Sequence, residues 1–191
     1  MKQDKDHIVE ILLHSAQGFY DIGISAAAYL ENAPDGNTFT QKLAPAAVNI
    51  CFAAELLLKG LILISLKEAK SGHSLVNLFS HLPDELKKTL KAQYDTHQNI
   101  DKDKKNLGAI KMVVYKGKES LCVEDDENII LEKLLESHDR GFEKWRYNFE
   151  IEKEGLTFEI DFKSMNCLIK ATIDTINSIP YKRKLVFLSG K

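Results

Sequence analysis

The sequence has few cysteines, few arginines and no strong excess of charge of either sign. Its 26 basic and 28 acidic residues leave a formal net charge of −2, which does not indicate a protein that coats itself with nucleic acid or with an anionic membrane. Cys51, Cys122 and Cys167 lie far apart and form no CxxC pair, so a cysteine-based zinc site is not expected. Free cysteines in a reducing compartment are the simpler interpretation.

Targeting and membrane signals are also missing from the sequence pattern. The first residues are charged and contain no long apolar stretch, so we expect no signal peptide. Residues 44–66 are apolar over a length that can cross a bilayer, but Glu55 and Lys59 lie near the centre of this stretch. Each such charge costs roughly 2.5–3.5 kcal/mol on insertion scales. We therefore expect a buried helix of a cytoplasmic protein that has no membrane partner.

The motifs of several common enzyme classes are absent as well. The sequence contains no GxGxxG, Walker, HExxH or GxSxG pattern, so we predict neither a cofactor nor a metal site. Lysines concentrate between residues 102 and 118, where arginines and interleaved aromatic residues are scarce. A solvated loop is the default explanation of that charge, and phosphate contact is the alternative.

Apolar residues recur at helical spacing through most of the chain, with short breaks between the periodic segments. This pattern predicts a mainly α single domain over residues 1–191, folded as a bundle of five or six helices. We expect helices over residues 6–30, from residue 40 to about 70, from residue 126 or 128 to 149, and between residues 164 and 180, with two shorter helices starting near residues 74 and 83.

Two segments have the composition of extended structure. Residues 110–115 and 121–123 flank Lys116-Gly117-Lys118, which predicts either a small β-hairpin near 110–123 or a loop. Apolar and acidic residues alternate over residues 156–162, which favours a short strand or an extended lead-in to the last helix.

The apolar segment 45–83 carries the first candidate site. Glu55 and Lys59 are four residues apart, so they share one face of a helix that is otherwise almost wholly apolar. The pair is either a structural clasp between helices or part of a functional site. His73 follows the predicted helix stop at Gly72, where it can cap a helix end, bond a backbone carbonyl, or act in a site.

Further candidates lie in the predicted helix that ends at residue 149. His138 lies on the apolar seam of this helix and is either a hydrogen-bonded core residue or a ligand. Arg146 has Glu143 three residues before it and Glu150 four residues after it, which fits a salt-bridged helix face as well as a site. Tyr147 can present its hydroxyl to this polar group.

These polar positions, taken together, resemble the HEPN superfamily (higher eukaryotes and prokaryotes nucleotide-binding) over roughly residues 5–179. The resemblance implies a helical bundle that usually dimerises and binds RNA or a nucleotide, in a toxin–antitoxin or phage-defence system whose partner is a nucleotidyltransferase-like antitoxin. The candidate binding residues are Asn49, Glu55, Lys59, Tyr147 and Glu150. The catalytic residues stay unknown, with Arg146, His138 and His73 as candidates. The motifs that carry the resemblance are Asn49-x5-Glu55-x3-Lys59, Gly72-His73-Ser74-Leu75 and Trp145-Arg146-Tyr147-x2-Glu150.

The chain departs from the family in one respect that bears on catalysis. RNase members carry an arginine, four to six spacer residues and then a histidine, but no histidine follows Arg140, Arg146 or Arg183 at that spacing. Cleavage of that kind needs a proton donor or acceptor near neutrality and a cation for the phosphate. Any histidine would have to come from another helix, so whether the protein is an enzyme stays open.

Three hypotheses follow from the sequence. The first is a HEPN-like RNA- or nucleotide-binding protein without the standard RNase motif, and the second is a non-catalytic dimeric helical interaction module. The third is an unrelated small enzyme built around His73 and His138. The resemblance, together with the large apolar helix surface, predicts a homodimer.

Overall fold

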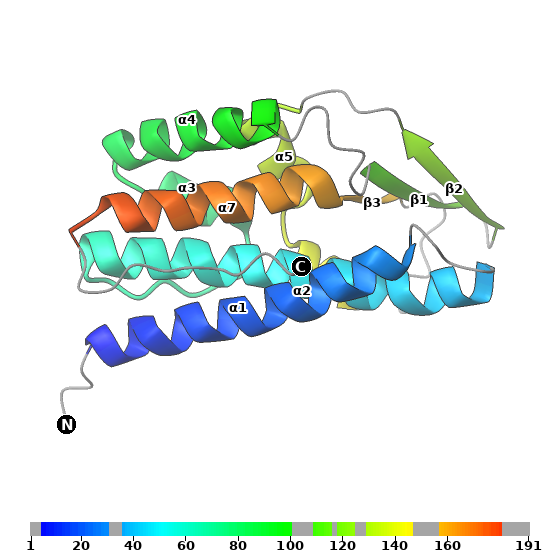
Figure 1. The fold of residues 1–191 in the computed structure, drawn as a ribbon, viewed down its shortest axis with the longest axis horizontal. Helices are drawn as coiled ribbons and strands as arrows, with labels where there is room; N and C mark the ends of the chain where they lie inside the picture. Colours follow the sequence, from blue (N-terminus) through cyan, green and yellow to red (C-terminus); the bar gives the residue numbers. More distant parts are fainter. Residues whose placement is uncertain are drawn as a thin grey trace.

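The computed structural model describes residues 5–30, 36–100, 109–115, 118–124, 129–146 and 157–180. Helices dominate these ranges, which confirms the predicted mainly α bundle (Figure 1). The long helices are α1 (Lys5–Leu30), α2 (Gly36–Leu66), α4 (Asp84–Ile100) and α7 (Phe162–Ser178), and the short ones are α3 (Leu75–Ser80), α5 (Leu131–Ser137) and α6 (Gly141–Arg146).

Helix α2 forms the centre of the bundle. It packs against α1 on one side and α7 on the other, and α4 lies against α7 (Figure 1). Among the described residues, Gln41–Leu66 is the stretch long and apolar enough to cross a membrane, but most of it is buried inside the protein. Fully buried side chains such as Leu57, Leu61 and Ile62 fill the core around it. This burial fits the core helix of a soluble bundle.

The boundaries of α2 differ from those predicted at both ends. The helix begins at Gly36, four residues before the predicted start at residue 40, and Pro45 lies inside it. It ends at Leu66 instead of near residue 70, because Lys67 adopts a left-handed backbone with φ of 58°. That conformation commonly terminates helices, usually at glycine.

The predicted helix from residue 126 or 128 to 149 is divided in two, which corrects that expectation. Residues 138–140 form a turn between α5 and α6, and Arg140 has a φ of 53°. After this turn, α6 packs closely against α2. A Cβ atom on Gly141 would lie 2.6 Å from Sγ of Cys51, so only glycine lets α6 approach α2 this closely.

Three strands pair at one end of the helices. Strands β1 (Ala109–Tyr115) and β2 (Lys118–Glu124) form the antiparallel hairpin predicted near 110–123, with Val113 opposite Ser120. Strand β3 (Thr157–Asp161) pairs antiparallel with the other edge of β1, so the order is β2-β1-β3. It leads directly into α7, which begins at Phe162 rather than near the predicted residue 164 and has Asp161 as its N-cap.

Candidate functional site

Glu55 is the buried centre of the candidate site. Only 1% of this residue is exposed, on the middle of an α2 surface that is otherwise apolar. Its Oε1 atom lies 2.7 Å from Nζ of Lys59, one helical turn later, and the lysine side chain is 16% exposed. The i,i+4 spacing places the two charges together, as the sequence predicted.

His73 also contacts Glu55, which the sequence did not predict. Its Nδ1 atom lies 3.1 Å from Oε1 and 3.0 Å from Oε2 of Glu55. A carboxylate only accepts hydrogen bonds, so this contact places a proton on Nδ1 and leaves Nε2 as the second nitrogen available for proton transfer. The imidazole is 38% exposed, whereas the carboxylate is buried, so His73 connects the buried acid to solvent.

The backbone around His73 is fixed by its neighbours. Gly72 has a φ of 93°, a left-handed conformation that lets the chain turn back toward α2. Ser74, not His73, caps α3, because its Oγ accepts the backbone N–H of Asn77 at 3.0 Å. The same hydroxyl donates to Oδ1 of Asp139 at 2.7 Å, so the loop that carries His73 is tied to the turn between α5 and α6.

The Phe142 ring brings helix α6 to the same place. It stacks on Phe52 of α2, with 4.3 Å between the ring centroids, and its centroid lies 5.5 Å from that of the His73 ring. The Cζ atom of Arg146 lies 5.8 Å from the centre of the Phe142 ring. Arg146, one turn after Phe142, is exposed. A cation and an aromatic ring from α6 therefore adjoin a histidine from the loop after α2, which is bound to a carboxylate of α2.

The nearby cysteine is not suited to nucleophilic chemistry. Cys51 lies one turn before Glu55 and is buried. The pKa of its thiol is raised to about 12, mainly by burial and in lesser part by the charge of Glu55, while Lys144 acts in the opposite direction. The thiol therefore stays protonated at neutral pH, and the thiolate is the reactive form.

His138 belongs to the core rather than to this cluster. It is buried, its Nε2 accepts the backbone N–H of Asp161 at 2.9 Å, and its Nδ1 lies 3.1 Å from the carbonyl oxygen of Leu134. Burial lowers the pKa of the imidazole to about 4, with Lys144 acting in the same direction and Asp161 against it. These contacts are those of a neutral histidine that joins α5 to the end of β3. Of the two roles predicted for His138, they fit the hydrogen-bonded core residue.

The remaining candidates are placed differently. The amide of Asn49 donates to the backbone carbonyl of Pro45 at 2.7 Å, which is a local contact within α2. Tyr147 and Glu150 lie outside the described residues. Glu143, predicted as a partner of Arg146, has Oε2 at 3.9 Å from a guanidinium nitrogen of Arg140.

Sequence reasoning missed two contributors to the site. Phe142 lies on the apolar seam of the predicted helix, which by itself indicates a core residue. Nothing in the sequence indicates that Asp139 binds the loop before α3. Within the part of the chain that the structure describes, no group of three histidine, cysteine or acidic side chains is arranged to hold a metal ion.

No family model, curated protein or solved structure matches this chain.

Proposed function

We propose that this protein binds RNA or a nucleotide at the surface formed by His73, Phe142 and Arg146. The observation that carries the proposal is one half-buried aromatic ring that lies close to both a histidine and an exposed arginine. This combination suits a nucleotide because arginine binds phosphate oxygens, and bases stack on aromatic rings for about 1–3 kcal/mol each. Lys59 adds positive charge beside the histidine.

Glu55 has a positioning role in this proposal. Its buried carboxylate holds the Nδ1–H of His73, which leaves Nε2 to donate to, or accept from, a bound ligand. His73 is thus available for proton transfer, although no histidine follows an arginine after four to six residues, as it does in RNase members of the HEPN superfamily. Cleavage of RNA is therefore measured alongside binding.

The test is fluorescence anisotropy with a labelled single-stranded RNA of mixed sequence at low salt. We expect the wild type to bind and Arg146→Ala to raise the dissociation constant about tenfold, the effect of losing one charge-assisted contact. Lys88→Ala on α4 is the matched control, because Lys88 is an exposed cation paired with Glu85 at 2.9 Å. No binding by the wild type, or equal effects of the two substitutions, would contradict the proposal.

Cleavage is followed in the same samples on a denaturing gel. If the wild type cuts the RNA, His73→Ala should abolish cutting, because His73 supplies the proton-transfer nitrogen. Intact RNA in every sample, together with Arg146-dependent binding, would support a binding protein without RNase activity. Growth arrest when this protein is expressed, relieved by co-expression of a neighbouring nucleotidyltransferase-like gene, would support the toxin–antitoxin system that the resemblance implies.

The alternative is a non-catalytic dimeric helical interaction module. It is favoured by the internal contacts of Glu55, whose oxygens are held by Lys59 and His73 of the same chain. In that case the cluster only locks α2 to the loop after it. A wild type that neither binds nor cleaves RNA would favour this alternative, whereas RNA cleavage that Arg146→Ala abolishes in a folded protein would contradict it.

A further inference from the structure

Helix α1 has two apolar faces, and only one of them is covered in the described structure. Val9, Leu13 and Tyr20 point into the core and are nearly fully buried. Ile11, Ile22 and Tyr29 are 52%, 57% and 63% exposed. They are separated by eleven and seven residues, close to whole helical turns, so they lie along one outward face.

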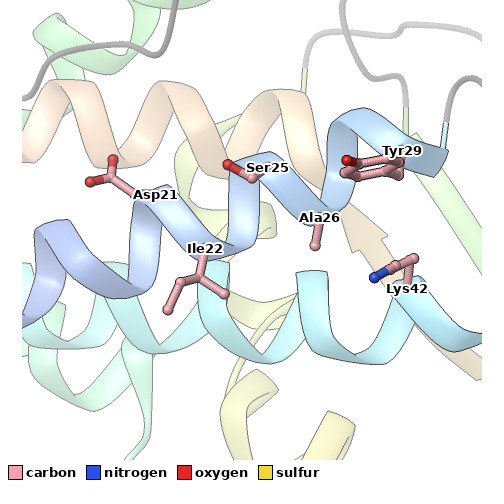
Figure 2. Close-up of a pocket in the computed structure, with 6 residues that line it drawn as sticks. All are labelled: Asp21, Ile22, Ser25, Ala26, Tyr29 and Lys42. Atoms are coloured by element: carbon pink, nitrogen blue, oxygen red, sulfur yellow. The ribbon is translucent and has the colours of Figure 1, made fainter.

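An open groove lies beside this outward face, between α1 and the start of α2. It encloses about 480 Å³. Figure 2 shows Asp21 at one end, Lys42 and Tyr29 at the other, and Ser25 between them. Lys42 reaches from α2 to within 5.6 Å of the centre of the Tyr29 ring. The groove is lined by Asp21, Ile22, Ser25, Ala26, Tyr29 and Lys42, which we call the α1 patch.

The charges of the α1 patch are arranged to match a second copy of the patch. An acid and a base stand at opposite ends, with the exposed Ile22 near the acid and the exposed Tyr29 beside the base. In a twofold contact, residue i of one copy meets residue j of the other, and j meets i. A twofold axis that passes Ser25 would place Asp21 of each copy opposite Lys42 of the other. It would also bring Ile22 against Tyr29.

We propose that the α1 patch is the contact between two copies of this chain around a twofold axis at Ser25. A helix that is apolar on opposite faces is normally covered on both, and the charge pattern selects a second copy as the cover. The proposal names a surface of the protein that is distinct from the His73, Phe142 and Arg146 surface, and it does not depend on RNA binding.

Charge reversal tests the proposed pairing. The mass and dissociation constant are measured by sedimentation for the wild type, Asp21→Lys, Lys42→Glu and the double variant. Each single reversal places like charges opposite each other twice, so we expect dimerisation to weaken about tenfold or more. The double variant restores both pairs with the charges exchanged, and its dissociation constant should return to within about threefold of the wild type.

Two matched comparisons test the apolar contact and the axis. Ile22→Glu should yield monomers, whereas Ile100→Glu on α4, where the isoleucine is 58% exposed, should leave the dimer intact. A short bismaleimide should cross-link Ser25→Cys into dimers but not Ser80→Cys on α3, because only a residue at the axis meets its own copy. Melting curves by circular dichroism confirm that each variant is folded.

A wild type that remains monomeric at roughly 100 µM, a concentration well above the dissociation constant of a stable dimer, would overturn the proposal. So would a dimer that is insensitive to Ile22→Glu, or a double charge variant that stays as weak as the single ones. Any of these results would mean that something other than a second copy covers this face.

Discussion

Nδ1 of His73 lies 3.0 Å from Oε2 of Glu55, although eighteen positions separate the two residues in the chain. The contact joins the loop after α2 to the middle of that helix. It gives the buried carboxylate a second partner besides Lys59, and it fixes which nitrogen of the imidazole faces the acid. Phe142 and Arg146 lie near this contact, and together the four residues form the candidate site.

Removing only the acid of the buried pair should destabilise the protein. Glu55→Ala leaves the mostly buried Lys59 ammonium and the Nδ1–H of His73 without their acceptor. We expect the free energy of unfolding to fall by about 3 kcal/mol, as when one partner of a buried ion pair is deleted. Urea denaturation followed by circular dichroism measures this loss.

Removing both charges should be far less harmful. In Glu55→Leu/Lys59→Met no buried charge remains, and the apolar side chains fit the surrounding core, so stability should return to within about 1 kcal/mol of the wild type. A double variant as unstable as Glu55→Ala would contradict this view of the pair. A stable double variant with normal RNA binding would assign the pair a structural role only.

The close approach of α6 to α2 makes Gly141 sensitive to a single added methyl group. Gly141→Ala would place Cβ 2.6 Å from Sγ of Cys51 and should cost about 1–3 kcal/mol of stability. Cys51→Ala removes the sulfur, so the double variant should be more stable than the sum of the single effects predicts, by about 1 kcal/mol or more. Urea denaturation of the four proteins measures this coupling.

Gly18→Ala is the control for the Gly141 experiment. A Cβ atom at Gly18 has no neighbour within 4 Å, so this substitution should stabilise α1 by about 0.5–1 kcal/mol. If Gly141→Ala were tolerated as well as Gly18→Ala, or if its effect were independent of Cys51, the explanation would be wrong. The contact with Cys51 would then not be the reason for glycine at position 141.

Stability should fall in mild acid because of His138. Its folded-state pKa of about 4 lies below the ordinary value of 6.5, so the unfolded chain binds the proton more tightly. The contribution of the neutral His138 to the free energy of unfolding is complete above about pH 6.5. As the pH falls toward 4, this contribution is lost, and the loss is on the order of 3 kcal/mol. Protonation also turns Nε2 into a donor that faces the N–H of Asp161.

The measurement compares urea unfolding of the wild type at about pH 7.5 and about pH 5 with that of His138→Gln, since this variant lacks the titrating group. The variant should be less stable at the higher pH, but it should lose less stability than the wild type between the two. An equal loss in both proteins would show that groups other than His138 cause the change.

Cys51 should be inert toward thiol reagents while the protein is folded. It is buried, and its raised pKa of about 12 leaves almost no thiolate at about pH 8. Mass mapping after iodoacetamide treatment should find Cys51 modified only when urea is added. Modification in the native protein would show that the region between α2 and α6 opens on the time scale of labelling.

The sequence predicts those features of the structure that depend on local spacing. Apolar periodicity predicted helices close to α1 and α7, and the i,i+4 rule predicted that Glu55 and Lys59 meet on α2. The residues on either side of Lys116-Gly117-Lys118 predicted either a hairpin or a loop, and pairing between β1 and β2 decides for the hairpin. Helix ends were less well predicted, because Lys67 and Arg140 take left-handed backbones that propensity assigns to glycine.

Tertiary structure decided the rest. The contact of His73 with Glu55 depends on the path of a loop that Ser74 and Asp139 hold in place, and no spacing rule encodes that path. The proximity of Phe142 to His73 depends on how α6 packs against α2 after the division of one predicted helix at residues 138–140. The sequence by itself determined a helical bundle with one acid and one base in its central helix, because helix periodicity is local. Only packing between distant segments brought a histidine, an aromatic ring and an arginine to that pair.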